Sequence, residues 1–376
     1  MNIESIAMKK LTKRDFLATS ALGSAALLAG CGGGNDAGTT PGKPATSAGG
    51  RQFITVGTAP VGGVFFVVGG AISDVISANK GENNWTVSAE ASRGSQENIR
   101  LISSGDQQLS MANSSISYFA ARGEGGWDKA YPINAVMTMF PLIAQFVTKK
   151  GSGIKSLKDL KGKRVVVGPE GAGFEYFIRP ILAAHGVTYD DFEPVFAGQQ
   201  TSVGYLGDGN VAASFLGGGI PTAAITSAAS TMDIEFVPFD EKAKAELIEK
   251  YEFYQAATIK GGTYKGIDED FHGMNVGSAH LICAAEADEE LIYQLTKTIF
   301  ENRADIAAKA KPGRAINEKN SVRNTGVTFH PGAVRYYTEK GFWPGSATAA
   351  DAGGKATAPA EEKKPAEEAK PAEAKK

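Results

Sequence analysis

The sequence has 376 residues, and its 39 lysines and arginines against 41 aspartates and glutamates give a formal net charge of −2 at pH 7. This balance lacks the basic surplus of proteins that bind nucleic acid or a membrane surface, so we expect neither partner for the folded region. The length allows two lobes with separate hydrophobic cores.

Residues 1–30 are typical of a signal peptide. Four basic residues precede an apolar stretch at 16–28, which is shorter than the roughly 20 residues that span a bilayer. The small residues ahead of Cys31 resemble a lipobox, so we expect lipidation of Cys31 to be the chain's only attachment to a membrane. The Gly-, Ser- and Thr-rich residues 31–50 predict a flexible tether. The expected location is therefore periplasmic or on the cell surface, with a lipid anchor at Cys31.

The first part of the folded region, residues 51–144, alternates short β-type runs with helical patterns. Such alternation predicts a parallel sheet wrapped by helices, and we assign these units to a first lobe. The predicted strands are 53–57, 85–89 and 109–113, and the predicted helices are 64–79, 95–104 and 115–122.

The same pattern restarts with a predicted strand at 163–168 and continues with a helix at 173–185. This restart predicts a second lobe over residues 145–255, after which residues 256–345 return to the first lobe. The expected details are crossings between the lobes near 143–149 and 251–260, a strand at 279–284 and one long helix at 288–310.

Composition also predicts two smaller features. The C-terminal residues 346–376 consist mainly of alanine, proline, glutamate and lysine, which indicates a disordered tail. Of the two cysteines, Cys283 lies in an apolar run, so we expect it to be buried and to form no disulfide with Cys31.

Two Gly-rich turns, at 57–63 and 168–173, are the strongest candidates for a binding site. Each opens a predicted helix at the carboxyl end of a strand, one in each lobe, and ligands bind at such ends in open α/β sheets. Backbone N–H groups and the positive end of a helix dipole attract anions, so we predict a carboxylate held in a cleft between the lobes. The alternative is that the glycines serve only tight turns and helix packing. Neither turn has the spacing of a nucleotide-binding loop, and no cofactor is expected.

The candidate ligand-binding residues lie in these turns and at the starts of nearby helices. Arg93 could bind a carboxylate through two hydrogen bonds, or it could be a surface charge. Ser95, Asn98 and Ser114 could face the cleft, or they could be helix caps and solvated side chains. The full set is Gly62, Gly63, Val64, Phe65, Arg93, Ser95, Asn98, Ser114, Gly171, Ala172, Gly173 and Phe174.

Several short motifs between Ile54 and Trp343 resemble, in their order and spacing, the TAXI family of TRAP-transporter solute receptors. Each motif is modest alone, and the specificity comes from their combination. The motifs are Gly57-Thr58 with Gly62-Gly63-Val64-Phe65-Phe66, Glu90-Ala91 with Gly94-Ser95-Gln96-Glu97-Asn98, Ile154-Lys155-Ser156-Leu157 with Lys163-Arg164-Val165, Gly219-Ile220-Pro221-Thr222, and His330-Pro331-Gly332-Ala333.

The resemblance implies both a fold and a function. The fold is the α/β, two-lobed clamshell of periplasmic binding proteins, type II-like, with the ligand cleft between the lobes. The function is extracytoplasmic capture of a small organic acid and its delivery to an ion-driven TRAP membrane permease with fused small and large subunits.

Two departures from the family pattern bear on the ligand. Phe65 and Phe66 stand where the family usually has tyrosines, and Ala172-Gly173-Phe174 stands where it usually has Ser-Gly-Thr. Each lost hydroxyl removes a hydrogen bond worth about 1.5 to 3 kcal/mol to a charged group. We therefore expect an acid with fewer polar groups than glutamate, or one that Arg93 and the backbone bind.

The histidines give no sign of catalysis. None of the four, at positions 185, 272, 280 and 330, has metal-ligand spacing or stands beside a nucleophile motif. We therefore expect no catalytic residue, no metal site and no enzymatic activity. The alternatives are a ligand-sensing protein that signals to a membrane receptor, which would use the same clamshell, and a hydrolytic enzyme.

Overall fold

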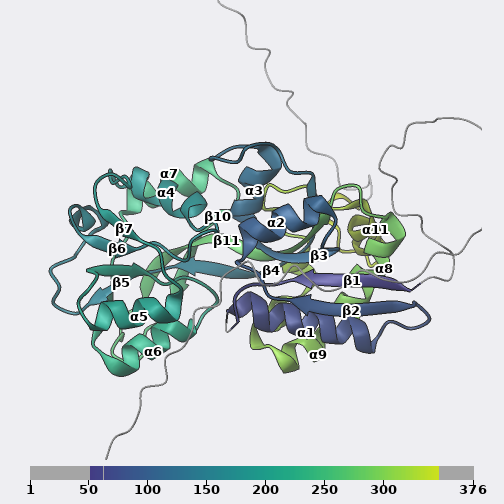
Figure 1. Cartoon of the computed structure of the whole chain (residues 1–376), viewed down its shortest axis with the longest axis horizontal. Coiled ribbons are helices and arrows are strands. Elements are labelled where there is room, and N and C mark those ends of the chain that lie inside the picture. The colour runs from purple at the N-terminus through teal and green to yellow at the C-terminus, as the bar shows by residue number, and fades with distance from the viewer. Residues whose placement is uncertain (1–50, 62, 347–376) are drawn as a thin grey trace, which may run out of the picture. The chain divides into compact units, whose positions relative to one another are not determined.

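A computed structural model describes residues 51–61 and 63–346, which belong to one compact unit (Figure 1). The predicted signal peptide, Cys31, the tether, Gly62 and the tail from residue 347 onward lie outside the described residues.

The described chain contains two β-sheets. Sheet A has the order β10-β11-β3-β1-β2, and β4 pairs with the other edge of β11. In it β1 runs parallel to β2 and β3, whereas β11 is antiparallel to β3, β4 and β10. Its strands are β1 (Gln52–Gly57), β2 (Trp85–Glu90), β3 (Leu109–Asn113), β4 (Ile133–Ala144), β10 (Tyr254–Ile259) and β11 (Phe271–Ala284).

Sheet B takes all of its strands from one continuous part of the chain. Its order is β7-β6-β8-β5-β9, with β6 parallel to β7 and β8, and β5 antiparallel to β8 and β9. The strands are β5 (Phe146–Lys149), β6 (Arg164–Val166), β7 (Glu193–Val195), β8 (Ala213–Phe215) and β9 (Ile234–Phe236). Its helices are η1 (Leu157–Leu160), α4 (Glu175–Ala184), α5 (Gln199–Gly207), α6 (Ala223–Thr231) and α7 (Glu241–Lys250).

Helices cover both faces of sheet A. Figure 1 shows α2 and α3 on one side of β1 and β3, and α1 on the other side. The helices are α1 (Val64–Ala78), α2 (Ser95–Ser104), α3 (Ser114–Arg122), α8 (Glu289–Glu301), α9 (Arg303–Lys309), η2 (Lys311–Ala315), α10 (Glu318–Ser321), α11 (Pro331–Glu339) and η3 (Pro344–Ser346). The α/β fold with two sheets agrees with the predicted fold class.

Local sequence signals determine where several helices begin and end. Asn113, Asp240 and Asp288 cap α3, α7 and α8, because each side chain accepts a hydrogen bond from a backbone N–H in the first turn. Gly105 ends α2 with a φ of 84°, a left-handed conformation that glycine adopts without strain. The boundaries predicted for α2, residues 95–104, are confirmed.

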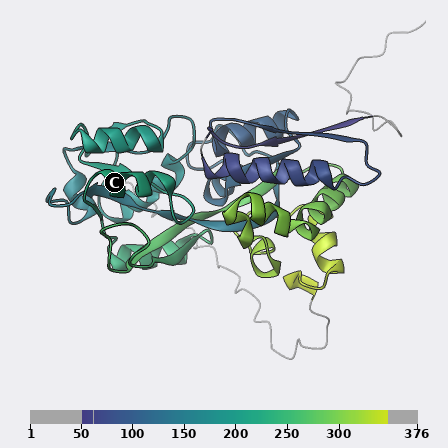
Figure 2. The same ribbon diagram turned by 90° about the horizontal axis from the view of Figure 1, so that it is seen from below.

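Two long strands connect the sheets. β4 ends at Ala144 and β5 begins at Phe146, so Gln145 alone separates a strand of sheet A from a strand of sheet B. At this level β4 pairs with β11, with Ala144 opposite Met274. Figure 2 shows the two strands as long neighbours. The chain therefore passes from sheet A to sheet B along β4, where β4 is paired with β11.

Two expectations about the C-terminal part need correction, and β4 was not predicted. The single helix at 288–310 was wrong, because α8 ends and α9 begins at Asn302, whose φ of −105° and ψ of 23° are not helical. The Asn302 side chain donates to the carbonyl of Thr298 at 2.9 Å and so competes with helix continuation. The strand at 279–284 was too short, since β11 begins at Phe271, and β4 had no counterpart among the predicted strands.

The buried apolar side chains form two clusters. One packs around sheet A and includes Ile54 and Leu281. The other packs around sheet B, includes Phe215, and continues into Ile116 and Phe119 of α3. An apolar contact therefore runs from the helices of sheet A to sheet B.

Cys283 lies fully buried in β11, as predicted. Burial raises the pKa of its thiol far above the ordinary value, and Glu286 raises it further. The thiol therefore stays protonated and behaves as a small apolar group.

Candidate functional site

The first Gly-rich turn follows β1 and leads into α1. Gly63 is the N-cap residue of α1 and provides no side-chain cap. Thr58 is fully buried, and both its backbone N–H and its hydroxyl donate to the carbonyl of Glu90, at 2.9 and 2.7 Å. The turn is therefore fixed to the carboxyl end of the neighbouring strand β2.

The second Gly-rich turn follows β6 and leads into α4. Gly168, Gly171 and Gly173 have φ values of 100°, 74° and 86°, which L side chains rarely adopt. A Cβ on Gly168 would lie only 2.3 Å from the ring of Phe174. Three positions of this turn therefore require glycine, and the two turns occupy equivalent places in the two sheets.

The structure brings residues of the second turn against the elements that follow β2 and β3. A Cβ on Gly94 would lie 3.7 Å from the Cβ of Ala172. A Cβ on Gly173 would lie 3.2 Å from Cδ1 of Ile116 and 3.3 Å from Cβ of Gln96. These close approaches place Ala172 and Gly173 between α2 and α3.

Arg93 and Val64 also lie at this contact. A Cβ on Gly171 would be 3.6 Å from Cδ of Arg93, whose side chain is exposed. A Cβ on Gly219, in the loop after β8, would be 3.8 Å from Cγ2 of Val64 and 3.6 Å from the ring of Phe140. Five of the predicted residues therefore meet across the two sheets: Val64, Arg93, Gly171, Ala172 and Gly173.

Three other predicted residues bind the protein's own backbone through their side chains, although the buried Oδ1 of Asn98 has no hydrogen-bond partner among the described residues. The hydroxyl of Ser95 accepts from the N–H of Asn113 at 3.0 Å, and that of Ser114 accepts from the N–H of Ser278 at 2.9 Å. The Asn98 amide donates to the carbonyls of Thr58 and Met111 at 2.7 and 2.8 Å. These bonds tie α2, α3 and the strand ends together, and a ligand contact by these side chains stays a prediction.

The two predicted phenylalanines pack into the apolar clusters. Phe65 is buried in the cluster of sheet A. Phe174 packs against Phe177 and Phe215, with ring centroids 5.3 and 5.8 Å apart. Both aromatic rings fix the turns beside them, and whether either touches a ligand stays a prediction.

An aromatic group borders the contact on the α3 side. The ring of Tyr176 stacks on Trp127 at 5.3 Å and on Phe119 at 6.3 Å, and its hydroxyl accepts from the Gln96 amide at 3.2 Å. Burial raises the pKa of Tyr176. The tyrosine therefore supplies a neutral hydroxyl beside the second turn.

Arg323, which precedes the chain segment beside β4, was not among the predicted site residues. Its Nη2 donates to the hydroxyl of Ser278 and to the carbonyl of Met139, the latter at 3.4 Å. Its buried Nε has no hydrogen-bond partner in the part of the chain that the structure describes. Burial lowers the pKa of the guanidinium. No sequence pattern marks this arginine, because its neighbours come from β4 and β11, far away in the chain.

The sequence analysis also missed Gln145, the residue between β4 and β5. Its side chain is fully buried, and neither its amide nitrogen nor its amide oxygen has a hydrogen-bond partner among residues 51–61 and 63–346. Its backbone carbonyl accepts from Leu216 at 2.9 Å, directly after β8. Gln145 therefore sits at the carboxyl end of β8, where a ligand of sheet B is expected.

The histidines lie in separate places. His280 is fully buried in β11, with Nε2 2.8 Å from the hydroxyl of Ser117, and burial lowers its pKa to about 3. His330 caps α11 by accepting from the N–H of Gly332 at 3.2 Å. In the described residues, no group of histidine, cysteine and acidic side chains is arranged to hold a metal ion.

The sequence of residues 56–341 matches the NMT1-like family. The match covers most of the chain and includes both Gly-rich turns and all strands of sheet B. The chain belongs to the NMT1-like family.

Several solved structures are similar to this NMT1-like protein at low sequence identity. PhnD1 of Prochlorococcus marinus, solved with methylphosphonate, is 12% identical and has a TM-score of 0.50, with 73% of this chain and 94% of that chain covered. Its likeness shows that the two chains share the same α/β fold.

Two further solved structures are less similar. The binding protein component of an ABC phosphonate transporter from Pseudomonas aeruginosa is 9% identical, with a TM-score of 0.48 and coverage of 70% of this chain and 79% of that one. The periplasmic aliphatic sulphonate binding protein SsuA from Escherichia coli is 12% identical, with a TM-score of 0.41 and coverage of 76% and 84%.

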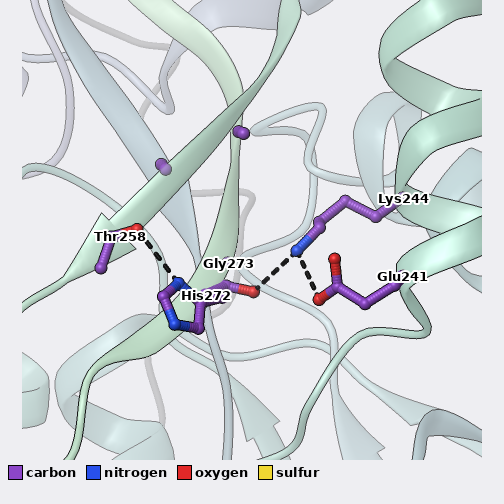
Figure 3. Close-up of a pocket in the computed structure, with 7 residues that line it drawn as sticks. Glu241, Lys244, Thr258, His272 and Gly273 are labelled. Atoms are coloured by element: carbon purple, nitrogen blue, oxygen red, sulfur yellow. Dashed lines mark hydrogen bonds and ion pairs between the residues drawn. The ribbon is translucent and has the colours of Figure 1, made fainter.

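Two surface cavities of the NMT1-like chain lie apart from the predicted residues. One, of about 340 Å³, lies between α7 and the paired strands β10 and β11 (Figure 3). There the buried Lys244 ammonium binds Glu241 at 2.7 Å and the carbonyl of His272 at 3.2 Å. The other, of about 270 Å³, is lined by Arg164, Val195 and Tyr205 among others. Because Glu241 neutralises Lys244, the first cavity offers no free charge to a ligand.

A membrane-spanning helix was not among the predictions. Across residues 51–61 and 63–346, no helix is long and apolar enough to cross a membrane.

Proposed function

We propose that this NMT1-like protein is the extracytoplasmic solute-binding component of a transporter, and that it captures a small organic acid between the elements of sheet A and sheet B. The observation that carries the proposal is the pair of Gly-rich turns. One turn stands at the carboxyl end of a parallel strand in each sheet, and residues of the second turn, Ala172 and Gly173, lie directly against α2 and α3. Such strand ends are where ligands bind in open α/β sheets.

A ligand between the turns would act by bridging the two sheets. Contacts to both sheets make the closed arrangement bind more tightly, so ligand raises its population. The membrane permease would then recognise the closed form. The protein itself performs no reaction in this scheme, and it needs no cofactor.

The finer assignment is to a TRAP transporter of the TAXI type. It is supported by the order of the motifs that begin at Gly57 and end at Ala333. The rival assignment is to an ABC transporter, the type of transporter to which the similar Pseudomonas aeruginosa protein belongs. The shared chemistry is an oxyanion, and we propose a carboxylate because the family resemblance implies one.

The N-terminal residues support an exported protein held to a membrane. We propose that Cys31 carries a lipid and that the folded part works outside the cytoplasm, in the periplasm or at the cell surface. Mass spectrometry of the N-terminal peptide from membranes tests this, and a peptide that begins at Cys31 with a diacylglyceryl mass is the expected result.

Thermal unfolding of the purified protein tests the binding function. The panel is amino acids, dicarboxylates, keto acids and aromatic carboxylates, together with alkyl phosphonates and sulfonates. A ligand at a hundredfold excess over its Kd adds about 2.7 kcal/mol of stability, which raises Tm by roughly 5 °C for a protein of this size.

The neutral amide of each active acid is the control, and it should give no shift. A shift with one carboxylate class supports the proposal and names the substrate, and shifts with phosphonates alone favour the rival transporter class. If no oxyanion of the panel raises Tm, the proposal is overturned.

A further inference from the structure

Arg323 carries a charge that nothing in the described chain neutralises. Among residues 51–61 and 63–346, the ion pairs join other lysines and arginines to carboxylates, and Arg323 takes part in none of them. Its hydrogen-bond acceptors are neutral, namely the Ser278 hydroxyl and the Met139 carbonyl. A partly buried guanidinium without an anion is costly, because the lost hydration is not repaid.

Hydrogen bonds link Arg323 to a residue of the proposed site. Ser278, which it contacts, lies on β11 just beyond the carboxyl end of β3, since Ala279 pairs with Asn113. The N–H of Ser278 in turn donates to the hydroxyl of Ser114, the first residue of α3. A chain of hydrogen bonds therefore joins Arg323 to a residue that the sequence analysis placed in the binding site.

Two features leave the guanidinium able to bind a further group. Its buried Nε–H has no partner in the described chain, and a guanidinium offers five donors, of which only those of Nη2 are used here. The positive end of the α3 dipole, capped by Asn113, points to the same strand end and adds to the attraction of an anion.

We propose that Arg323 is the residue that binds the carboxylate of the ligand, with Ser278 and the start of α3 beside it. This inference rests on the proposed function and deepens it, because it replaces the exposed Arg93 with a partly buried arginine as the ligand's counter-ion. A desolvated guanidinium binds a carboxylate far more strongly than an exposed one, since solvent screens the exposed charge.

The test compares three variants of the full chain by calorimetry, with the carboxylate that gives the largest thermal shift as the probe. Arg323→Gln should raise Kd at least about tenfold, the minimum for loss of one charged hydrogen bond. Arg323→Lys keeps the charge but lacks the planar guanidinium. Its Kd should lie between those of the wild-type protein and Arg323→Gln.

Arg122→Gln is the matched control. Arg122 is an exposed arginine that donates to the carbonyl of Gly326, in the same loop as Arg323, at 2.9 Å. Its loss should leave Kd within about twofold, the range of a screened surface charge.

The two hypotheses fail in different ways. If the wild-type chain binds no acid, the proposed function fails. If it binds an acid and folded Arg323→Gln binds equally well, Arg323 is a structural residue and this inference is overturned.

Should Arg323→Gln not fold, the nitrogen NMR signal of the Arg323 Nε–H answers the question in the wild-type chain, with Arg323→Lys for assignment. A downfield proton shift on saturation supports the inference, and an unmoved signal overturns it.

Discussion

At the scale of single residues, the described chain shows polar atoms that the protein itself does not satisfy. Gln145 is the clearest case, because both atoms of a fully buried amide lack partners there. A buried unsatisfied polar group lowers folding stability by about 1 to 3 kcal/mol. Such a group is therefore retained where another interaction or a function offsets this cost. The position of Gln145 at the end of β8 makes a bound solute one such compensation.

Gln145→Met should therefore raise the free energy of unfolding of the ligand-free protein by about 1 kcal/mol, because it replaces an unsatisfied amide by an apolar chain of similar length. Urea denaturation measures the change. The matched control is Gln107→Met, since the buried Gln107 amide accepts from the Ser110 hydroxyl and its loss should be destabilising. An equal loss of stability in both variants would show that Gln145 has a partner after all.

At the scale of elements, α4 has a left-handed glycine at each end. Gly173 precedes the helix with a φ of 86°, and Gly186 follows it with a φ of 70°. Nothing lies within 4 Å of a Cβ on Gly186, whereas a Cβ on Gly173 meets Ile116 at 3.2 Å. The two glycines therefore share a backbone requirement, and only Gly173 also carries a contact to α3.

Gly173→Ala and Gly186→Ala should each lower the free energy of unfolding by about 1 kcal/mol, the cost of a left-handed alanine. Only Gly173→Ala should also weaken ligand binding, because its methyl group would hold the second turn away from α3. Denaturation and calorimetry of both variants separate the two effects. Equal ligand affinity in the two variants would mean that binding does not depend on this contact.

At the scale of the whole molecule, pH should act through His280 in the central strand of sheet A. Burial lowers the pKa of His280 to about 3 in the folded protein, whereas an unfolded histidine titrates near its ordinary value of about 6.5. Below about pH 6.5 the His280 imidazole is protonated in the unfolded chain, whereas in the folded chain it stays neutral. His280 therefore favours the folded state fully above about pH 6.5, and its contribution is lost as the pH falls toward 3.

The free energy of unfolding should fall by about 2 kcal/mol between pH 7 and pH 5 on account of His280 alone. His280→Asn removes this titration, so urea denaturation at the two pH values should show a loss smaller by that amount. His330, whose pKa burial also lowers, contributes equally to both proteins and cancels in the comparison. Parallel pH curves for the two proteins would refute the assignment.

Much of the fold could be predicted because its signals are local. The short β-type run 109–113 and the glycine at 105 are enough to predict β3 and the end of α2. By contrast, β4 and β11 are buried on both faces, so they show no alternation that distinguishes a strand, and one was missed and the other shortened. The break at Asn302 depends on one side-chain hydrogen bond, which periodicity does not reveal.

The candidate site was predictable only where backbone conformation marks it. Glycines at 171 and 173 signalled a turn that must adopt positive φ, and the structure has both there. Polar side chains gave a weaker signal, because a serine such as Ser95 looks the same in a sequence whether it binds a ligand or the N–H of Asn113. Arg323 and Gln145 stand out only through the partners that they lack, and those are known only from the folded structure.

The position of β11 in sheet A has a consequence for how the chain is made. β11 lies between β3 and β4, so the edges of these two strands that pair with β11 stay without a partner until residues 271–284 have been synthesised. Sheet B, whose strands all lie between Phe146 and Phe236, can close before that point. A chain that emerges N-terminus first therefore carries an exposed edge of β3 from the end of β3 at Asn113 until β11 is complete at Ala284, and an unpaired edge invites aggregation. Chaperone binding would be needed most over this interval.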